Sequence, residues 1–346
     1  MIMNRRSSNV LLVATLTVSV LCACGESDLK DIEQRELESA RRVTQMQAEV
    51  EVGAEALGET ETETETETET ETETETETET ETETETEVDT TPAAALSGVD
   101  TSEMELIFSD EFNDDAIDDA KWNTAQTWGP DLVINDELQY YVDTLSNTDT
   151  GFNPFSFDGE SLTISAIETP ENLQAAANNQ PYLSGVLTTA GKFDMTFGYI
   201  EARIDFPIGT GLWPAFWMLS SEFEGLKPQL FIAEGDGAKP SSVFHNYNYH
   251  DADGNLRSPG QWQVTSEEFA EGFHTIGVSW KAEELLFYID GEARYRIVGE
   301  SVSTQAMYLI TNLAVGGIWT GAPDSATIYP AELKIDYIRA YRHSEI

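Results

Sequence analysis

Residues 211–237 read GLWPAFWMLSSEFEGLKPQLFIAEGDG, and the interpretation of the rest of the chain starts from this stretch. In a regular strand Gln229, Phe231 and Ala233 would share one face, and Glu234 would point to the other. Alternation alone therefore separates the carboxyl group of Glu234 from the side chains of Gln229 and Phe231.

Segments with the β-branched and aromatic composition of strands lie on both sides of this stretch. They are residues 162–167, 199–206, 273–280, 285–290, 295–298, 307–315 and 333–341. Polar and apolar residues alternate most clearly in 199–206, and Asp290-Gly291 favours a tight hairpin turn. No segment of useful length has the period of a helix. The pattern predicts an all-β domain of two packed sheets.

A series of longer strings runs in order through the last two thirds of the chain. They are FSDEFN (108–113), NDELQYY (135–141), YIEARIDFP (199–207), LWPAFWML (212–219), FHTIGVSW (273–280), FYIDGE (287–292), LAVGGIW (313–319) and LKIDYIRAYR (333–342). This ordered set resembles glycoside hydrolase family 16, the laminarinase, lichenase and agarase group. The resemblance implies a two-sheet β-jelly roll of the concanavalin-like kind, with a sugar cleft across its concave sheet.

The family signature E-x-D-x-x-E supplies a nucleophile, a helper aspartate and an acid/base. By this resemblance Glu234 is the acid/base, Gln229 stands at the nucleophile position and Phe231 at the helper position. The family's pattern has a β-bulge before the last glutamate, so the resemblance also implies that Gln229, Phe231 and Glu234 line the cleft floor together. A glutamine amide is too weak a nucleophile for a glycosyl-enzyme intermediate, but it can bind sugar hydroxyls. The apolar neighbour Phe231 predicts a raised pKa for Glu234. An alternative register, with Glu234 as nucleophile and Asp236 as helper, would need a glutamate where Lys239 stands.

Aromatic side chains are the expected sugar-binding surface, because the C–H faces of sugar rings stack on them. The resemblance places Trp213 and Trp319 along the cleft, puts Asn135 and Arg203 near the sugar, and gives some members a cleft histidine at the position of His245. The predicted sugar-contacting residues are Trp213, Trp217, Trp319, Asn135, Arg203 and His245. Trp217 suits a buried core position equally well. For His245 the alternative is a structural role, which is the more common one for a lone histidine on a strand. Trp128 and Trp262, in irregular Gly- and Pro-flanked segments, are weaker candidates.

A structural calcium ion is a further implication of the resemblance. Many members hold Ca²⁺ with backbone carbonyls and an aspartate of the last strand, and Gly159 and Asp336 match two of these positions. One carboxylate with carbonyl oxygens suits this ion. The alternative is that Asp336 is only a charge on an edge strand. No Cys/His set for zinc and no phosphate-binding glycine motif occurs in the sequence.

Residues 1–24 have the pattern of an export signal. Arg5 and Arg6 precede an apolar run that is too short to cross a bilayer, and the run ends in Leu21-Cys22-Ala23-Cys24. This ending resembles a bacterial lipobox, with Cys24 as the lipidated residue. An ordinary secretory signal is the alternative. We therefore expect a protein of the bacterial cell envelope, lipid-anchored at the outer membrane or cell surface, and without internal disulfides because no cysteine follows Cys24.

Residues 25–58 form a polar spacer, and glutamate alternates with threonine from Glu59 to Glu87. Like charges at every second position repel one another and bury nothing, so residues 59–101 are predicted to be a disordered linker. Residues 102–346 remain as the folded domain.

The net charge of −46 excludes nucleic acid and anionic lipid surfaces as partners, because such a chain repels both. A neutral polysaccharide such as β-glucan is the expected ligand, and we expect a monomer. The leading hypothesis is a lipid-anchored polysaccharide-binding protein whose hydrolysis is impaired or lost. The alternative is an active endo-β-glycosidase that hydrolyses O-glycosyl bonds of β-glucans.

Overall fold

The computed structural model describes residues 99–129, 132–146, 150–222, 228–265 and 272–343. All of them belong to the unit Thr60–Ile346. The predicted signal, the lipobox cysteine Cys24, the spacer and almost all of the Glu-Thr linker lie outside the described residues. Within those ranges, no helix has the length and apolar character that a membrane crossing requires.

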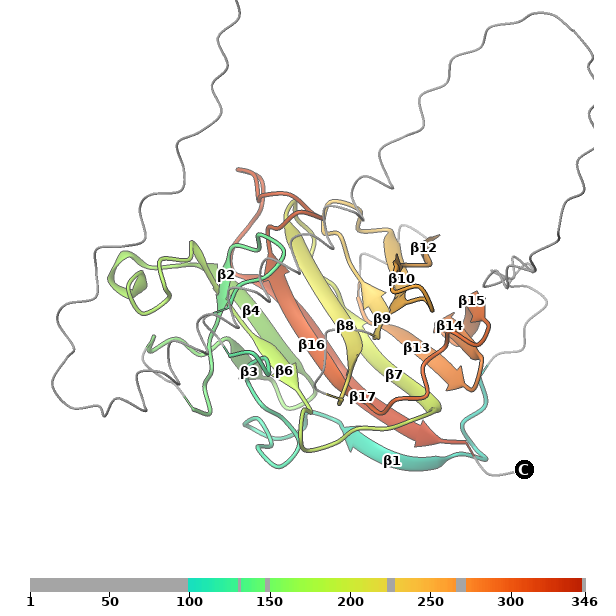
Figure 1. Ribbon diagram of the computed structural model, residues 1–346. Coiled ribbons are helices and arrows are strands. Elements are labelled where there is room, and N and C mark those ends of the chain that lie inside the picture. Colours follow the sequence, from blue (N-terminus) through green and yellow to red (C-terminus); the bar gives the residue numbers. More distant parts are fainter. Residues whose placement is uncertain (1–98, 130–131, 147–149, 223–227, 266–271, 344–346) are drawn as a thin grey trace, which may run out of the picture. The chain divides into compact units, whose positions relative to one another are not determined.

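The described strands form two sheets (Figure 1). One of them has ten strands. Its main path runs through β15 (Glu292–Val298), β14 (Glu284–Ile289), β13 (His274–Lys281), β7 (Gly198–Asp205), β17 (Ala331–Arg342), β4 (Leu162–Glu168), β5 (Tyr182–Ser184) and β2 (Gln139–Tyr141). Two further strands, β1 (Glu105–Asp110) and β3 (Phe155–Phe157), pair with β17 and β4. All pairs are antiparallel except β2 with β5.

The other sheet has seven strands and contains the stretch from which the sequence was interpreted. Its order is β11 (Leu256–Arg257), β10 (Ser242–His250), β9 (Gln229–Glu234), β8 (Leu212–Ser220), β16 (Met307–Val315) and β6 (Val186–Thr188), with β12 (Gly260–Val264) paired with β10. A short 3₁₀ helix, η2 (Glu171–Leu173), lies between β4 and β5. The predicted all-β, two-sheet jelly roll is confirmed.

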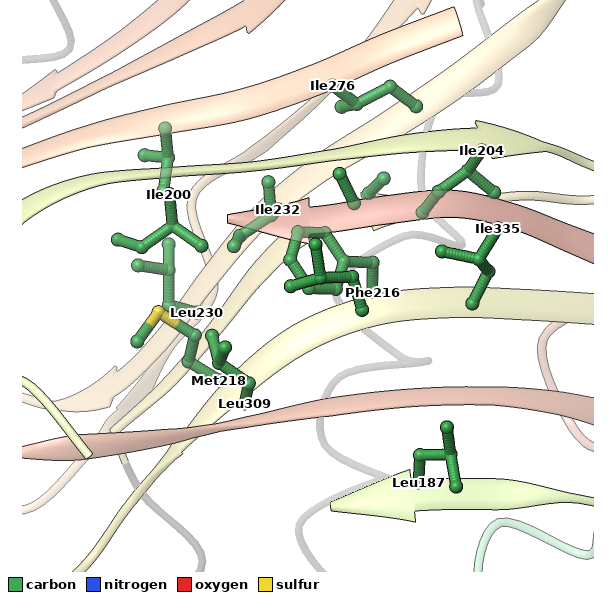
Figure 2. Close-up of a cluster of buried hydrophobic side chains, with 14 of the residues drawn as sticks. Leu187, Ile200, Ile204, Phe216, Met218, Leu230, Ile232, Ile276, Leu309 and Ile335 are labelled. Carbon is green, nitrogen blue, oxygen red and sulfur yellow. The ribbon is translucent and has the colours of Figure 1, made fainter. Parts of the chain in front are cut away.

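The main core lies between the two sheets (Figure 2). Phe216 and Met218 of β8 and Leu230 of β9 are fully buried in one cluster with Ile200 and Ile204 of β7. Burying each of these side chains contributes about 1.5–3 kcal/mol to folding. The even-numbered side chains of β8 are therefore committed to the core, and the odd-numbered ones point to the opposite face of the sheet.

We call that opposite face the site face. Residues directly paired across neighbouring strands share a face, so the pairing defines its members. They are Trp213, Ala215, Trp217 and Leu219 of β8, Gln229, Phe231 and Glu234 of β9, Phe244, Asn246 and Asn248 of β10, and Tyr308, Ile310 and Asn312 of β16.

Candidate functional site

A bulge in β9 brings three predicted residues to the site face. Trp217 pairs with Phe231 and Ala215 pairs with Glu234, so three residues of β9 advance against two of β8. The register shifts in the same way against β10. Gln229, Phe231 and Glu234 consequently lie on one face, as the family resemblance implied.

Glu234 is the buried carboxyl group of this face, only 4% exposed. The indole nitrogen Nε1 of Trp213 donates a hydrogen bond of 3.1 Å to its Oε1. Burial raises the pKa of Glu234 to about 8, the nearby Glu137 adds to the rise, and the hydrogen bond from Trp213 opposes it. The direction is the one expected from the sequence. At neutral pH Glu234 therefore retains its proton and is able to donate it.

Gln229 belongs to a chain of side-chain hydrogen bonds along β9 and β10. Asn248 Nδ2 donates to Gln229 Oε1 at 3.0 Å, and Asn246 Nδ2 donates to Asn248 Oδ1 at 3.2 Å. Ser258 Oγ in turn donates to Asn246 Oδ1 at 3.1 Å. We call these four residues the amide ladder. Because its oxygen already accepts a hydrogen bond, Gln229 has Nε2 as its donating end, and it brings no charge to the site.

Phe231 lies against Trp217, with ring centroids 5.2 Å apart and planes 13° apart. Trp217 is 6% exposed, and its Nε1 donates to Asn312 Oδ1 at 2.9 Å. Asn312 Nδ2 then donates to Tyr141 Oη at 2.9 Å. Trp217 thus reaches the site face but is covered, which favours its alternative interpretation as a packing residue beneath the site.

Four half-buried rings gather beside Glu234, and we call them the aromatic cluster: Trp213, Phe244, Trp262 and Trp319. The ring centroid of Trp319 lies 5.1 Å from that of Trp213 and 5.4 Å from that of Trp262. The ring planes of Trp319 and Trp262 are nearly parallel, with an angle of 7° between them. Lys239 Nζ lies 4.5 Å from the centre of the Trp262 ring. Trp262, a weak candidate from sequence, is brought here because β12 pairs with β10 and sets it opposite Phe244.

Glu137 is a site residue that the sequence reasoning missed, although it lies within the quoted string NDELQYY. Its Oε1 accepts a hydrogen bond from Asn135 Nδ2 at 3.0 Å, and its Oε2 accepts one from Gln139 Nε2 at 2.6 Å. A Cβ atom added to Gly317 would lie 3.2 Å from a ring carbon of Trp213 and 3.4 Å from Cγ of Glu137. Atoms of Asn135, Glu137 and Trp213 therefore all lie around this glycine. Burial raises the pKa of Glu137 to about 7.

The prediction that His245 contacts sugar is wrong. The side chain is 0% exposed and lies on the core side of β10, with its ring 4.9 Å from that of Phe287 in the other sheet. Nδ1 lies 2.6 Å from the carbonyl oxygen of Ile232, to which it donates. Burial lowers its pKa to about 4. The alternative interpretation, a core histidine, describes this residue.

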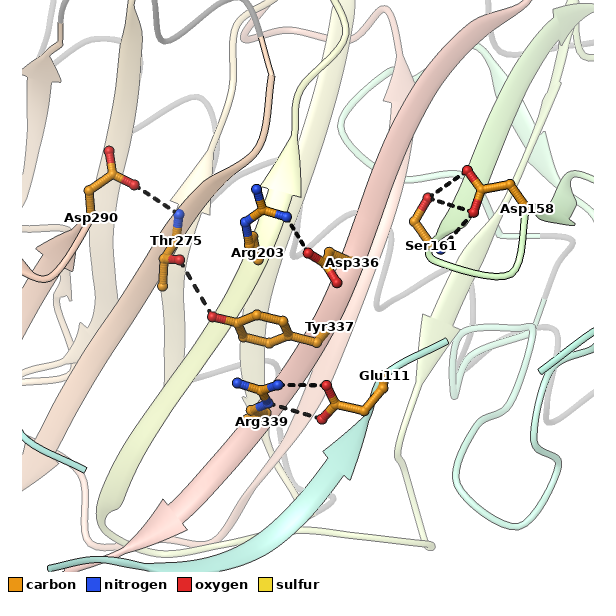
Figure 3. Close-up of polar contacts among 9 residues, drawn as sticks. All are labelled: Glu111, Asp158, Ser161, Arg203, Thr275, Asp290, Asp336, Tyr337 and Arg339. Atoms are coloured by element: carbon orange, nitrogen blue, oxygen red, sulfur yellow. Dashed lines mark hydrogen bonds and ion pairs between the residues drawn. The ribbon is translucent and has the colours of Figure 1, made fainter. Parts of the chain in front are cut away.

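The prediction that Arg203 lies near the sugar is also wrong. Arg203 is on β7 of the ten-stranded sheet, where its neighbours Ala202 and Ile204 point into the core. It therefore points away from the core and from the site face. Its guanidinium forms an ion pair with Asp336 of β17 and lies 4.8 Å from the ring centre of Phe273 (Figure 3).

The two residues proposed for calcium lie in the ten-stranded half of the molecule. Asp336 already has Arg203 as a cationic partner. Gly159, with φ of +88°, lies in the turn between β3 and β4, where Asp158 accepts hydrogen bonds from the backbone and side chain of Ser161 (Figure 3). In the ranges that the structure describes, no three His, Cys, Asp or Glu side chains group as metal ligands. These residues therefore offer one carboxylate that is already paired, a poor donor set for Ca²⁺, and calcium stays a prediction.

Comparison with known proteins agrees with this architecture. The model of the family described as Glycosyl hydrolases family 16 matches residues 138–339. Endo-1,3-1,4-beta-glycanase EglC of Rhizobium meliloti (strain 1021) is 35% identical over 250 residues, which cover 70% of this chain and 53% of that protein. The chain thus spans about half the length of this relative.

Two further proteins extend the comparison. The catalytic domain of an endo-1,3-beta-glucanase (laminarinase) from Thermotoga petrophila RKU-1 superimposes with a TM-score of 0.60 at 29% identity, covering 70% of this chain and 99% of that one. A more distant relative, Beta-1,3-glucan-binding protein of Penaeus monodon, is 25% identical and covers 43% of this chain and 51% of its own length. The similarities thus include proteins named for cleavage and one named for binding.

Proposed function

The chain belongs to glycosyl hydrolase family 16, and from this premise we propose that its folded domain binds β-glucan or a related neutral polysaccharide, with hydrolysis impaired or lost. The proposal rests on which side chains of β9 occupy the site face. Gln229 and Phe231 lie beside Glu234, where a retaining glycosidase needs a second carboxylate.

The site face lacks the second carboxyl group that cleavage with retention requires. A retaining glycosidase holds two carboxyl groups roughly 5–5.5 Å apart, one as nucleophile and one as acid/base. The amide of Gln229 is held by Asn248, and the ring of Phe231 is stacked on Trp217. Neither side chain attacks an anomeric carbon, and loss of a nucleophile commonly reduces turnover by several orders of magnitude.

The site retains the groups that bind a sugar without cleaving it. The aromatic cluster offers rings on which sugar C–H faces stack, and the amide ladder offers a donor at Gln229. Protonated Glu234 offers a further donor beside Trp213. The relative from Penaeus monodon that is named for β-1,3-glucan binding supports the same proposal.

Endo-β-glycosidase activity is the second candidate, and Glu234 is the observation that favours it. A carboxyl group with its pKa raised to about 8 is suited to act as a general acid at neutral pH. The relative that is 35% identical is named a glycanase. This candidate requires a nucleophile or base other than Gln229.

A binding and cleavage assay on the purified protein separates the two candidates. The panel contains β-1,3-, β-1,4- and mixed-linkage glucans, agars and carrageenans, and each is scored for retardation in an affinity gel and for new reducing ends. Retardation by a glucan without reducing ends supports binding. Release of reducing ends that is abolished by Glu234→Gln would overturn it in favour of the hydrolase.

We further propose that the domain is exported and held at the bacterial envelope by a lipid on Cys24, with residues 25–101 as a spacer. The support is the lipobox-like string that ends at Cys24 and the like-charged Glu-Thr repeat that follows it. Such a spacer would extend the domain away from the membrane toward a polymer.

A further inference from the structure

We propose that Glu137 is a ligand-binding residue of the site, that it forms a two-carboxyl pair with Glu234, and that this pair favours uncharged sugars over anionic ones. The inference rests on the proposed function and deepens it, because it names the residue that sets the charge of the ligand.

The backbone places Glu137 at the end of β16, beside the aromatic cluster. Glu137 forms a β-bridge with Gly316, and the next residue, Leu138, donates its N–H to the carbonyl of Val315 at 2.7 Å. Gly317 has φ of +101°, and a Cβ there would come within 3.4 Å of atoms of both Trp213 and Glu137. A side chain at Gly317 would therefore press on both residues, and glycine leaves room for them on either side of the same backbone position.

The carboxyl group of Glu137 is held in a fixed orientation. Val315 N–H donates to Gln139 Oε1 at 2.7 Å, which leaves Gln139 Nε2 as the donor to Glu137 Oε2. Asn135 Nδ2 supplies the donor to the other oxygen. Each carboxylate oxygen has a second lone pair, so Glu137 can still accept a hydrogen bond from a ligand hydroxyl.

The two carboxyl groups influence each other. Glu137 raises the pKa of Glu234, and two close carboxyl groups do not ionise together easily. Burial raises the pKa values of both groups, and their repulsion favours a state in which the pair holds a single proton. In that state the pair offers a hydroxyl group one donor and one acceptor.

The surrounding titratable groups supply no positive charge to the pair. Tyr141 of β2 interacts with Glu137, and burial raises its pKa so that it stays neutral. His245 is neutral on the far side of β10. Lys239 is paired with Asp236 at 2.9 Å and lies over the Trp262 ring. Among the ion pairs of the described residues, none includes Glu137 or Glu234.

A negatively charged sugar would therefore meet the ionised member of the pair without a compensating cation. A neutral hydroxyl would meet an acceptor at Glu137 and a donor at Glu234. The discrimination depends on the charge of Glu137, so it should weaken below pH 7, where this side chain gains a proton.

The test measures the affinity of the purified protein for laminarin, a neutral β-1,3-glucan, and for a carboxymethylated β-1,3-glucan. Wild type should prefer laminarin at pH 7.5, and the preference should shrink at pH 5. Glu137→Gln should weaken laminarin binding at least 10-fold and reduce the preference for the neutral polymer, because one acceptor and one charge are lost together. Glu160→Gln, at an exposed glutamate in the turn before β4, is the matched control and should change neither.

The remaining outcomes separate failure of this inference from failure of the proposed function. Wild-type affinity and preference in a folded Glu137→Gln protein overturn this inference and leave the proposed function intact. Failure of wild type to bind any neutral polysaccharide of the panel overturns the proposed function and this inference with it. If Glu137→Gln does not fold, Glu137→Asp replaces it: this change keeps the charge but withdraws the carboxyl, so laminarin binding should fall while discrimination is retained, and unaltered laminarin binding rejects the inference.

Discussion

Trp213 Nε1 donates to Oε1 of Glu234 at 3.1 Å, and this contact joins the buried carboxyl of β9 to the aromatic cluster. Trp213 therefore both packs against the ring of Trp319 and holds the carboxyl group of Glu234 in position. Trp319, which lies against Trp213, provides the comparison, since it is an aromatic neighbour that does not hold Glu234.

Trp213→Phe is expected to raise the pKa of Glu234 further, because the indole hydrogen bond lowers it. Laminarin affinity should also fall, since a phenyl ring offers a sugar less stacking surface than an indole. Carbon-13 NMR of the labelled Glu234 carboxyl group, recorded as a function of pH, gives the midpoint of its titration directly. Trp319→Phe is the control, which should weaken stacking but leave the midpoint in place. An unchanged midpoint in Trp213→Phe would show that this hydrogen bond does not tune Glu234.

The free energy of unfolding should decrease as pH rises from 6.5 to 8. Both glutamates have folded-state pKa values, about 8 for Glu234 and about 7 for Glu137, above their ordinary value of 4.5. A raised pKa means that the folded state binds the proton more tightly, so this stability is complete below pH 4.5 and is lost as pH rises through the folded value. His245 has its pKa lowered from 6.5 to about 4, so its contribution is constant above pH 6.5.

The expected loss over that window is on the order of 2 kcal/mol, measured by urea unfolding at each pH. Glu234→Gln should flatten most of the dependence, because an amide does not titrate. A slope that persists unchanged in this variant would place the responsible group elsewhere.

His245→Ala should destabilise the domain by about 2–4 kcal/mol, because a fully buried ring that packs on Phe287 is replaced by a cavity. Its affinity for laminarin should stay within twofold of wild type at temperatures where it is folded, since the side chain does not reach the site face. A large loss of affinity without loss of stability would restore a direct role in binding.

The family resemblance implied that Gln229, Phe231 and Glu234 share one face, and the bulge in β9 on which this depends is present. Alternation alone would have turned Glu234 to the opposite face. The position of Glu137 could not be deduced in this way, because it depends on the loop before β2 meeting the end of β16 at Gly316. Trp262 likewise required the pairing of β12 with β10.

The two wrong assignments have the same kind of cause. Residues 199–206 alternate clearly, but alternation does not say to which sheet a strand belongs, and β7 joins the sheet opposite the site. For His245 the resemblance gave a position along the chain but did not decide which face of the strand the side chain occupies. Phe244 and Asn246, its neighbours on β10, are the residues that face the site.

Cys24→Ser should move the protein from the membrane fraction to the soluble fraction of a bacterial host. A thioether-linked lipid forms only on a cysteine, and no cysteine follows Cys24 in the sequence. Fractionation followed by immunoblotting measures the change, and Cys22→Ser is the matched control that should remain at the membrane. Membrane association that survives Cys24→Ser would place the attachment elsewhere.

The combined change Gln229→Glu and Phe231→Asp tests whether the site face retains the geometry of a retaining glycosidase. Both positions share a face with Glu234 through the bulge, so the two new carboxyl groups would stand at the family's nucleophile and helper positions. Asn248, which now donates to Gln229, would donate equally well to a carboxylate there.

Weak hydrolysis with retention of configuration is expected in the double variant, measured as reducing ends and by NMR of the first anomer released. Phe231→Asp alone should be inactive, because it supplies no nucleophile. Gln229→Glu alone should give little activity, because its charge would lie beside the aromatic pair Phe231 and Trp217 and be poorly solvated. A double variant that binds laminarin normally yet releases no sugar would contradict this expectation. The missing carboxylates would then not be the only obstacle to cleavage, and the positions of the strands would have to differ from those that an active enzyme needs.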